Sequence, residues 1–310
     1  MKANLNIAHL PDRLFQGITL IFALFIPLLF LAVFVMLAND ALPGIKSFGW
    51  HFLVNSQWDP VQDIYGAWPF IYGTLVSSLL ALIIAVPVGL GCALCLSEIA
   101  RPPWNTILGT LVDLLAAIPS VVYGLWGIFM LGPIMAETVQ PFLQRWLGFL
   151  PIFQGEFHGL SIFTAGVILA IMILPTITSI SREVFHVVPK SLRESAMAIG
   201  GNQFETIRLA VLPVAMSGVI GAIILGLGRA VGETMAVTMV IGNRPEVSGS
   251  LFAPSYTLSA VIANEFAEAV TDLNYSVLFE MGLILLAITI VLNGLARLLI
   301  WKIAKQKGKV

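Results

Sequence analysis

The stretch SREVFHVVPKSLRESAMAIGGNQFETIRLAVLP, residues 181–213, joins two long apolar runs and contains two signals for the start of a helix. Both signals fit the capping-box pattern, which pairs a small polar residue with an acidic residue three positions later: Ser191 with Glu194, and Asn202 with Glu205. Gly200 and Gly201 lie between them, where helices commonly end. The stretch predicts a short amphipathic helix, a glycine elbow and a longer helix. The plainer alternative is an interfacial helix lying on the lipid surface.

The rest of the chain has the composition of an integral membrane protein. Of its 310 residues, 58% are hydrophobic and only 11% are charged, whereas soluble domains carry about 25% charged residues. The mean hydropathy is +0.94. Six runs reach the ~20 residues that cross a bilayer as a helix: 14–37, 69–99, 107–131, 160–180, 209–242 and 277–301. They are continuously apolar, whereas the strands of a membrane barrel alternate. We therefore expect an all-α protein with six transmembrane helices.

The distribution of Lys and Arg predicts the orientation, because cytoplasmic loops carry an excess of these residues. With a cytoplasmic N-terminus, the outer loops 39–68, 132–159 and 243–276 hold few cations: Lys46, Arg145 and Arg244. The cytoplasmic side then holds most of them: Lys2, Arg13, Arg101, Arg182, Lys190, Arg193, Arg208, Arg297, Lys302, Lys305, Lys307 and Lys309. Both termini are therefore predicted to be cytoplasmic. Tryptophans in the outer loops either anchor helix ends or dock a soluble partner.

Arg229 and Glu233 are two full charges inside an apolar run, in GLGRAVGETMAV, residues 226–237. Each charge costs a contested ~2.5 kcal/mol or more in a membrane, so these side chains should face a bundle interior or a wet pathway. Four residues apart, they are expected to share one helix face. One reading is an internal ion pair that holds helices together, which brings little net stability. The other is a pathway for an anion. Asp113 or Glu280 could partner Arg229 across the bundle, Glu280 being expected near water.

The loop at 181–213 resembles the EAA loop of ATP-binding-cassette (ABC) importer permeases. That loop has E-A-A, three residues, Gly, nine residues and I-x-L-P. Here the matching residues are Glu194, Ser195, Ala196, Gly200, Leu212 and Pro213, with Ser195 replacing an alanine and Ala210 the isoleucine. The resemblance implies a type I importer fold and a short helix that docks into a cytoplasmic ATPase. We expect Glu194, Ser195, Ala196, Gly200 and Pro213 to serve that coupling.

The chain lacks the G-x-x-x-x-G-K-[ST] motif that holds nucleotide phosphates; its Gly-Lys pair, Gly308-Lys309, is followed only by Val310. ATP would therefore be used by a separate ATPase, and we expect no cofactor and no metal on this chain. Cys92 and Cys95 lie within the second apolar run without His or acidic neighbours, which favours packing over a redox or metal role.

A narrower resemblance is to the permeases of the Pst high-affinity phosphate importer, to the C-type permease more than to its partner. It rests on PFIYGTLVSSLLALIIAVPVGLG, LAAIPSVVYGLWG, SREVFHVVP, GLGRAVGETMAVTMVIGN and WDPVQDIYGAWPFIYGTL. It implies a second homologous permease (PstA-like), two ATPase subunits (PstB-like) and a periplasmic phosphate-binding protein (PstS-like), in a bacterial inner membrane. Membrane lipid and no nucleic acid are the other partner expectations. Residues 1–68 would form an anchor helix with the first outer loop, and residues 69–310 the permease core.

Phosphate suits the two charges. A guanidinium offers a planar fork of donors to phosphate oxygens, and a carboxylate can accept the proton that phosphate, unlike sulfate, still carries near neutral pH. We expect Arg229, Glu233, Thr234 and Asp113 to line the pathway. The rivals are a permease for sulfate or molybdate and an ion-driven secondary carrier, although no inverted repeat with paired broken helices is visible. A membrane scaffold that reports phosphate status could coexist with transport.

Overall fold

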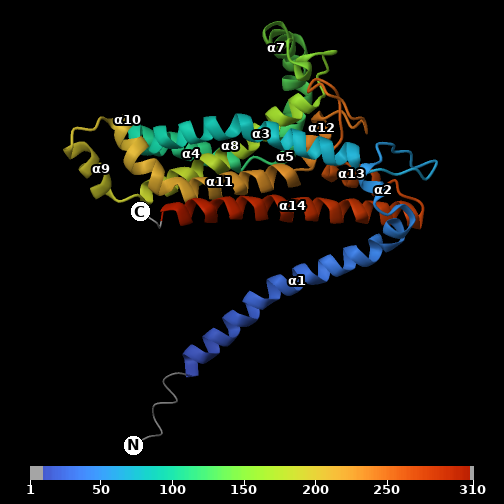
Figure 1. Ribbon diagram of the computed structural model, residues 1–310, viewed down its shortest axis with the longest axis horizontal. Helices are drawn as coiled ribbons and strands as arrows, with labels where there is room; N and C mark the ends of the chain where they lie inside the picture. Colours follow the sequence, from blue (N-terminus) through green and yellow to red (C-terminus); the bar gives the residue numbers. More distant parts are fainter. Residues whose placement is uncertain (1–9, 308–310) are drawn as a thin grey trace, which may run out of the picture.

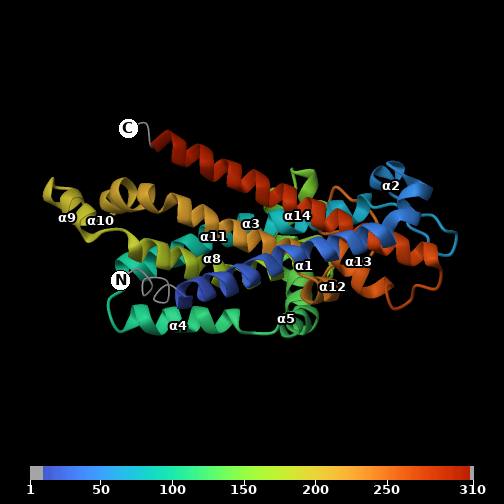
Figure 2. The ribbon, with the colours of Figure 1, turned by 90° about the horizontal axis from the view of Figure 1, so that it is seen from below.

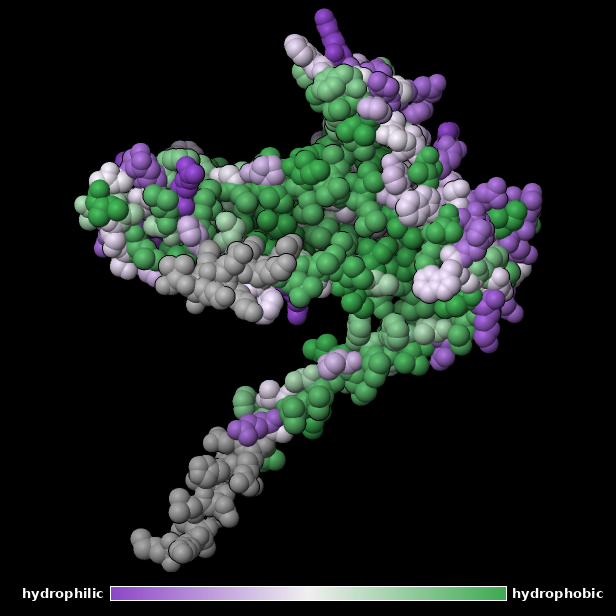
Figure 3. All heavy atoms as spheres, in the orientation of Figure 1, coloured by the Kyte–Doolittle hydropathy of each residue, from purple (hydrophilic) through white to green (hydrophobic). Residues whose placement is uncertain are grey.

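The computed structural model describes residues 10–307, which form helices and two isolated β-bridges but no sheet. Lys2 and Lys309, which contribute to the predicted charge asymmetry, lie outside the described residues. Six helical stretches of the described chain are long and apolar enough to cross a membrane, as predicted: Leu14–Phe48, Trp68–Ile99, Ser120–Leu147, Ile162–Val187, Gln203–Gly232 and Asp272–Leu298. On the face shown in Figure 3, a hydrophobic band lies between two more polar ends of the bundle.

The helices, with π-helical or 3-10 turns marked η, follow in this order: α1 Leu10–Phe48, α2 His51–Val54, α3 Trp68–Leu94, η1 Cys95–Ile99, α4 Trp104–Ala116, α5 Ser120–Trp126, η2 Gly127–Leu131, α6 Gly132–Ile134, η3 Met135–Val139, α7 Gln140–Leu147, η4 Pro151–Phe153, α8 Ile162–Val187, α9 Lys190–Ala198, α10 Gln203–Thr206, η5 Ile207–Val211, α11 Leu212–Gly232, α12 Met235–Val240, α13 Leu258–Glu265 and α14 Asp272–Lys307. Figure 1 shows α3, α8, α11 and α14 running along one bundle.

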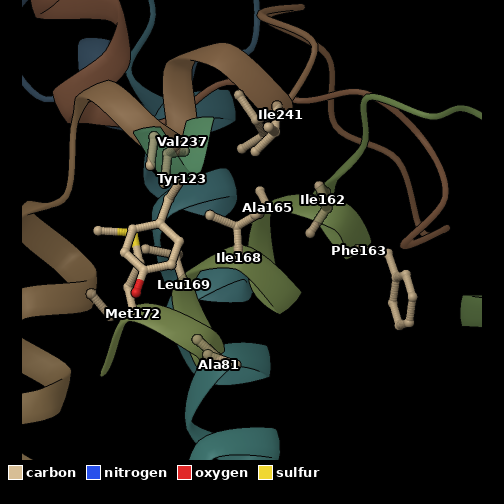
Figure 4. Packing of buried hydrophobic residues seen from close by; sticks show 14 of the residues in the cluster. Ala81, Tyr123, Ile162, Phe163, Ala165, Ile168, Leu169, Met172, Val237 and Ile241 are labelled. Atoms are coloured by element: carbon tan, nitrogen blue, oxygen red, sulfur yellow. The ribbon is translucent and has the colours of Figure 1, made fainter. Parts of the chain in front are cut away.

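Helix α8 is the centre of this bundle. In its most apolar window 72% of the residues are buried, against 33% or less in the other spans, and it packs against α3, α11 and α4. No charged residue interrupts α8 from Ile162 to Ile180, which suits this part of the helix to a buried position. Gly166 of α8 allows α3 to come close, because a Cβ on this glycine would lie 2.5 Å from Leu80 of α3. Figure 4 shows part of the resulting core, including Ile168 and Leu169.

The third predicted span is not one helix. The prediction of a single span over 107–131 is wrong, because α4 ends at Ala116 and α5 starts at Ser120. Pro119 explains the break: it takes the extended conformation just before α5, and a proline disfavours helix in the residue before it. After the break, the chain from α5 to α7 runs crosswise to the bundle (Figures 1 and 2). The third span-length helical stretch is therefore Ser120–Leu147.

Two of the predicted outer loops are also shorter than expected. Helix α1 continues to Phe48, through the first part of the loop expected at 39–68, and residues 132–147 are helical. The beginning of α1 and the end of α14 lie toward the end of the bundle that carries α9 (Figures 1 and 2). This arrangement puts both ends of the described chain on one side, as the predicted topology requires. Which side faces the cytoplasm stays a prediction, as does the division at residue 68.

Helix α1 leaves the bundle over its N-terminal half and contacts it near its C-terminal end (Figure 1). There the Gly44 amide donates to Ser276 Oγ of α14, at 2.8 Å. Glu280, one turn further along α14, lies beside Gly44 and is only 7% exposed, and its Oε2 has no hydrogen-bond partner. The expectation that Glu280 is near water is therefore wrong: the side chain is enclosed where α1 crosses α14.

Candidate functional site

The run that contains Arg229 and Glu233 is broken between them. Helix α11 ends at Gly232, Glu233 takes an extended conformation (φ −69°, ψ 128°), and α12 starts only at Met235. The bend expected within 209–242 is therefore present. The prediction that the two charges share one helix face is wrong, because the helix ends between them. No Arg229–Glu233 ion pair occurs among the described side chains. The reading of these residues as an internal pair loses its geometric basis.

Arg229 instead contacts α8. Its Nη1 donates to Thr176 Oγ1 at 3.3 Å, and both residues are half-buried. Gly226, one turn earlier in α11, makes this approach possible, because a Cβ there would lie 3.0 Å from Ile177. The glycine lets the two backbones come together. One hydroxyl contact leaves most of the five guanidinium donors available to another acceptor.

Glu233 and Thr234 support the helix break. The Glu233 side-chain Oε1 accepts from the Ala236 amide at 3.4 Å, and the Glu233 carbonyl accepts from Ser259 Oγ of α13 at 2.8 Å. The Thr234 carbonyl accepts from Thr238 Oγ1 at 2.7 Å. The first two bonds satisfy backbone groups that the break leaves without helical partners, whereas the Thr234 carbonyl also accepts from the Thr238 amide at 2.9 Å. Glu233 and Thr234 are both half-buried.

One face of α11 beside Arg229 is open. A Cβ added to Gly221, Gly228 or Gly232 would meet nothing within 4 Å. Leu225, on the same face, is 59% exposed. The spacing of these four residues follows the period of the helix, so they form one stripe along it. Arg229 therefore stands at the border between the packed core of the chain and an open helix face.

Tyr123 is a residue that the sequence reasoning did not single out. Its hydroxyl donates to the Leu115 carbonyl at 2.9 Å, across the break between α4 and α5, and its ring lies in the core cluster with Met172 and Val237 (Figure 4). It is also within electrostatic range of Arg229. A tyrosine in an apolar run is typical of ordinary core packing. The sequence therefore held no clear signal that Tyr123 connects the end of α4 to α5 near Arg229.

Asp113 is not brought to Arg229. It accepts hydrogen bonds from Ser179 and from Arg182 of α8, the latter at 3.4 Å. Asp113 and Arg182 border a polar hollow of about 210 Å³, which is lined by Leu96, Asn105, Thr106, Thr110, Asp113, Arg182, Glu183 and His186. The hollow lies toward the α9 end of α8. The expectation that Asp113 or Glu280 partners Arg229 is therefore wrong for both.

The loop at 181–213 has the predicted shape with one correction. Helix α9 begins at Lys190 after Pro189 and has no side-chain cap, so the capping box predicted at Ser191 and Glu194 is not formed. The second box is formed: Asn202 Oδ1 accepts from the Glu205 amide at 2.9 Å, and Glu205 Oε2 accepts from the Asn202 amide at 2.8 Å. In the first case Pro189 occupies the N-cap position in an extended conformation, and its side chain has no oxygen that could accept from the first amides of the helix.

The residues expected to couple to an ATPase gather at the end of the bundle. Glu194 and Ser195 are exposed, Ala196 is half-buried, and Gly200 forms the elbow with a φ of +90°. Pro213 lies in the first turn of α11. A hollow of about 410 Å³ opens inside the elbow, lined by Ala196, Ile199, Gly200, Gly201, Glu205, Thr206, Leu209 and Ala210. Ile199 and Leu209 are 89% and 71% exposed, so the elbow presents an apolar surface.

The two cysteines are free thiols. Cys92 is half-buried in α3 and Cys95 is exposed in η1. Among the described residues, no group of three or more His, Cys, Asp or Glu side chains is arranged to hold a metal ion.

Comparisons with known proteins place this geometry in a family. Residues 85–305 match the family described as binding-protein-dependent transport system inner membrane components. A phosphate transport system permease protein PstC from Pasteurella multocida is 47% identical over 306 residues, covering 97% of this chain and 95% of that protein. A PstC from Mesorhizobium japonicum is 44% identical over 303 residues, covering 96% and 93%.

Solved structures share the fold. A chain of a bacterial alginate ABC transporter, crystallised with an alginate-bound periplasmic protein, aligns with a TM-score of 0.60 at 17% identity, covering 93% of this chain and 96% of its own length. A chain of the MetNI methionine ABC transporter in an inward-facing conformation aligns with a TM-score of 0.55 at 17% identity, covering 80% and 99%.

Proposed function

We infer that this chain, which belongs to the family of binding-protein-dependent transport system inner membrane components, is the transmembrane permease subunit of an ATP-driven inorganic phosphate importer. It is a multi-pass membrane protein with the ABC importer permease fold. On its own it is a non-catalytic subunit that forms half of the translocation pathway.

The assignment of the pathway rests on the surroundings of Arg229. It is a permanent cation in the apolar span Gln203–Gly232, with one neutral partner, Thr176, and an open helix face beside it. A half-buried cation without a carboxylate partner attracts an anion, and the guanidinium fork matches the oxygens of phosphate. We assign Arg229 the role of a transient phosphate ligand.

We assign Glu233 and Thr234 to the same pathway, at the break that ends α11. Glu233 uses Oε1 for the Ala236 amide, and Oε2 has no hydrogen-bond partner among the described residues. That second oxygen is available to accept the proton of a hydrogen phosphate, which a sulfate lacks. The break gives the carboxylate a position separate from Arg229, so a substrate can contact both without competing with an ion pair.

We assign Asp113 to the route between the Arg229 region and the α9 end of the bundle, where it borders the polar hollow with Arg182. The elbow with Glu194, Ser195, Ala196, Gly200 and Pro213 would dock an ATPase subunit, which binds and hydrolyses ATP. The apolar surface of the elbow supports this docking, because Ile199 and Leu209 are exposed where the chain leaves the bundle. This chain would bind no cofactor itself.

The complete importer would contain a second, PstA-like permease, two PstB-like ATPase subunits and a PstS-like phosphate-binding protein. We place it in the inner membrane, with both termini and α9 cytoplasmic. The open stripe of α11 that contains Gly221 and Gly228 is suited to line the boundary with the second permease. Membrane lipid surrounds the remaining apolar surface.

The test is transport by the reconstituted complex. The four kinds of subunit are incorporated into proteoliposomes with ATP on the ATPase side, and uptake of radiolabelled phosphate is measured with and without excess sulfate or molybdate. We expect ATP-dependent uptake that sulfate does not compete away. Competition by excess sulfate or molybdate would favour a permease for another oxyanion, and uptake without ATP would favour an ion-driven carrier.

A further inference from the structure

The Arg193 side chain of α9 forms a two-point ion pair with Glu98, which lies in the π-helical turn η1 at the end of α3. The distances are 3.0 Å from Nε to Oε2 and 2.7 Å from Nη2 to Oε1. The side chains of Arg193 and Glu98 are only 16% and 10% exposed. A planar guanidinium bound at two points fixes both distance and orientation, which a lysine cannot do.

The same guanidinium also holds the end of α8. Nη1 donates to the Val188 carbonyl at 2.6 Å, and Nη2 donates to the Phe185 carbonyl at 2.7 Å. The last carbonyls of a helix lack partners within the helix, and Arg193 supplies donors to two of them. One side chain therefore connects α9 with the ends of both α3 and α8.

Glu98 is held from the other side of the glycine elbow as well. The Gln203 side chain of α10 donates to the Glu98 carbonyl at 2.8 Å. Arg193, before the elbow, and Gln203, after it, therefore both bind Glu98 of η1. The wider ring of a π-turn is frequent at functional sites, and this one lies at the end of the bundle where α9 and α10 project (Figure 1).

These contacts define a link between the coupling loop and the spans. We propose that Glu98 and Arg193 are positioning residues that transmit the movement of α9 to the ends of α3 and α8 during the ATPase cycle. The proposal rests on the proposed function, because it assumes that α9 docks on an ATPase. When α9 moves, the Arg193–Glu98 ion pair must either stay intact or break. If it stays intact, η1 and the end of α8 move with α9. Breaking it is costly, because the pair is largely desolvated and each charge would be left without its partner.

The test is the number of phosphate ions transported per ATP hydrolysed, measured in proteoliposomes with wild-type partner subunits. Glu98→Gln keeps the size and the backbone contact to Gln203 but removes the charge, and Arg193→Lys keeps the charge but removes the fork. We expect each to lower the ratio by about tenfold, which corresponds to losing one charge-assisted hydrogen bond in a coupling equilibrium, while ATP hydrolysis continues. The matched control is Lys190→Gln, at an exposed position of the same helix, and its ratio should stay at the wild-type value.

A variant with one unpaired buried charge can also fail to assemble, so the double variant Glu98→Gln/Arg193→Gln is included. It leaves no charge unpaired, and we expect it to assemble with the ATPase and to remain uncoupled. A wild-type ratio in the assembled double variant, or in both single variants, would overturn the proposal and leave the proposed function intact. If the wild-type complex itself moved no phosphate, the proposed function would fail instead.

Discussion

Arg229 and Glu233 lie on opposite sides of a helix break: Arg229 is in the last turn of α11, and Glu233 is the extended residue that follows its end at Gly232. Arg229 donates to Thr176 of α8, whereas Glu233 accepts from the Ala236 amide at the start of α12. The two charges therefore have separate partners, although they are only four residues apart. This separation allows each to meet a substrate, and it determines how their variants should behave.

Because the charges do not pair, neutralising both should not restore what neutralising one removes. We expect Arg229→Gln and Glu233→Gln each to reduce phosphate uptake by about tenfold or more, and the double variant to be no better than the worse single variant. Uptake is measured in cells that depend on this system, with the amount of subunit in the membrane determined in parallel. Substantial recovery in the double variant would revive the internal-pair interpretation.

Thr176 accepts a hydrogen bond from the Arg229 side chain and should position its guanidinium. Thr176→Val keeps the shape but removes the hydroxyl, and loss of one hydrogen bond of about 1–2 kcal/mol predicts an uptake rate lowered by about fivefold to thirtyfold at limiting phosphate. Thr289→Val is the control, because its hydroxyl donates to the Leu285 carbonyl within α14. Equal effects of the two variants would contradict a specific role for Thr176.

Gly200 forms the elbow with a φ of +90°, although a Cβ there would meet nothing within 4 Å. The cost of Gly200→Ala is therefore conformational, about 1–2 kcal/mol, and we expect it to displace α9 and lower phosphate transport per ATP. Gly294→Ala is matched: its Cβ also meets nothing within 4 Å, but its backbone is helical. Full coupling in the Gly200 variant would count against the docking role of the elbow.

The predicted orientation can be tested by labelling in intact cells. With Cys92 and Cys95 replaced by Ser, a cysteine at the exposed Ser56 should react with an impermeant thiol reagent, and a cysteine at the exposed Lys190 should react only after permeabilisation. Ser56 follows α2 closely and Lys190 begins α9, and these two helices lie at opposite ends of the bundle (Figure 1). The reverse labelling pattern would overturn the orientation, and with it the cytoplasmic docking of an ATPase.

The contact between α1 and α14 depends on Gly44. A Cβ at this position would lie 2.9 Å from Glu280 Oε2 and 3.3 Å from Ser276 Oγ, so Gly44→Ala should overpack the crossing at a cost of about 1–3 kcal/mol. We expect a lower thermal unfolding midpoint for the purified subunit. Gly17→Ala, in the part of α1 where a Cβ meets nothing within 4 Å, should leave the midpoint unchanged. Equal midpoints for the two variants would show that the crossing is loosely packed.

The sequence by itself determined the membrane-spanning architecture, because the cost of exposing backbone or charge to lipid leaves a strong, local signal. Runs of about 20 apolar residues were enough to predict six helical stretches of membrane-spanning length, although the third of them begins at Ser120 and not at residue 107. The capping box of Asn202 with Glu205 and the elbow at Gly200 also follow from local chemistry, in which a side chain or a positive φ acts within a few residues. Charges in apolar runs are rare, so the sequence also singled out Arg229 and Glu233 as candidate residues, and their role in transport stays a prediction.

Tertiary structure decided which groups meet, since contacts between residues far apart in sequence leave no periodic trace. From the sequence, the positions at Pro119 and after Gly232 could each have been kinks within one continuous helix. In the structure each is the end of a helix, because α5 and α12, which start after these positions, pack against each other and against α8. The partners of Arg229, Asp113 and Arg193 are Thr176, Arg182 and Glu98, each more than fifty residues away. A charged side chain accepts any complementary neighbour within reach, and the helix crossings, set by glycines such as Gly226, determine which neighbour that is.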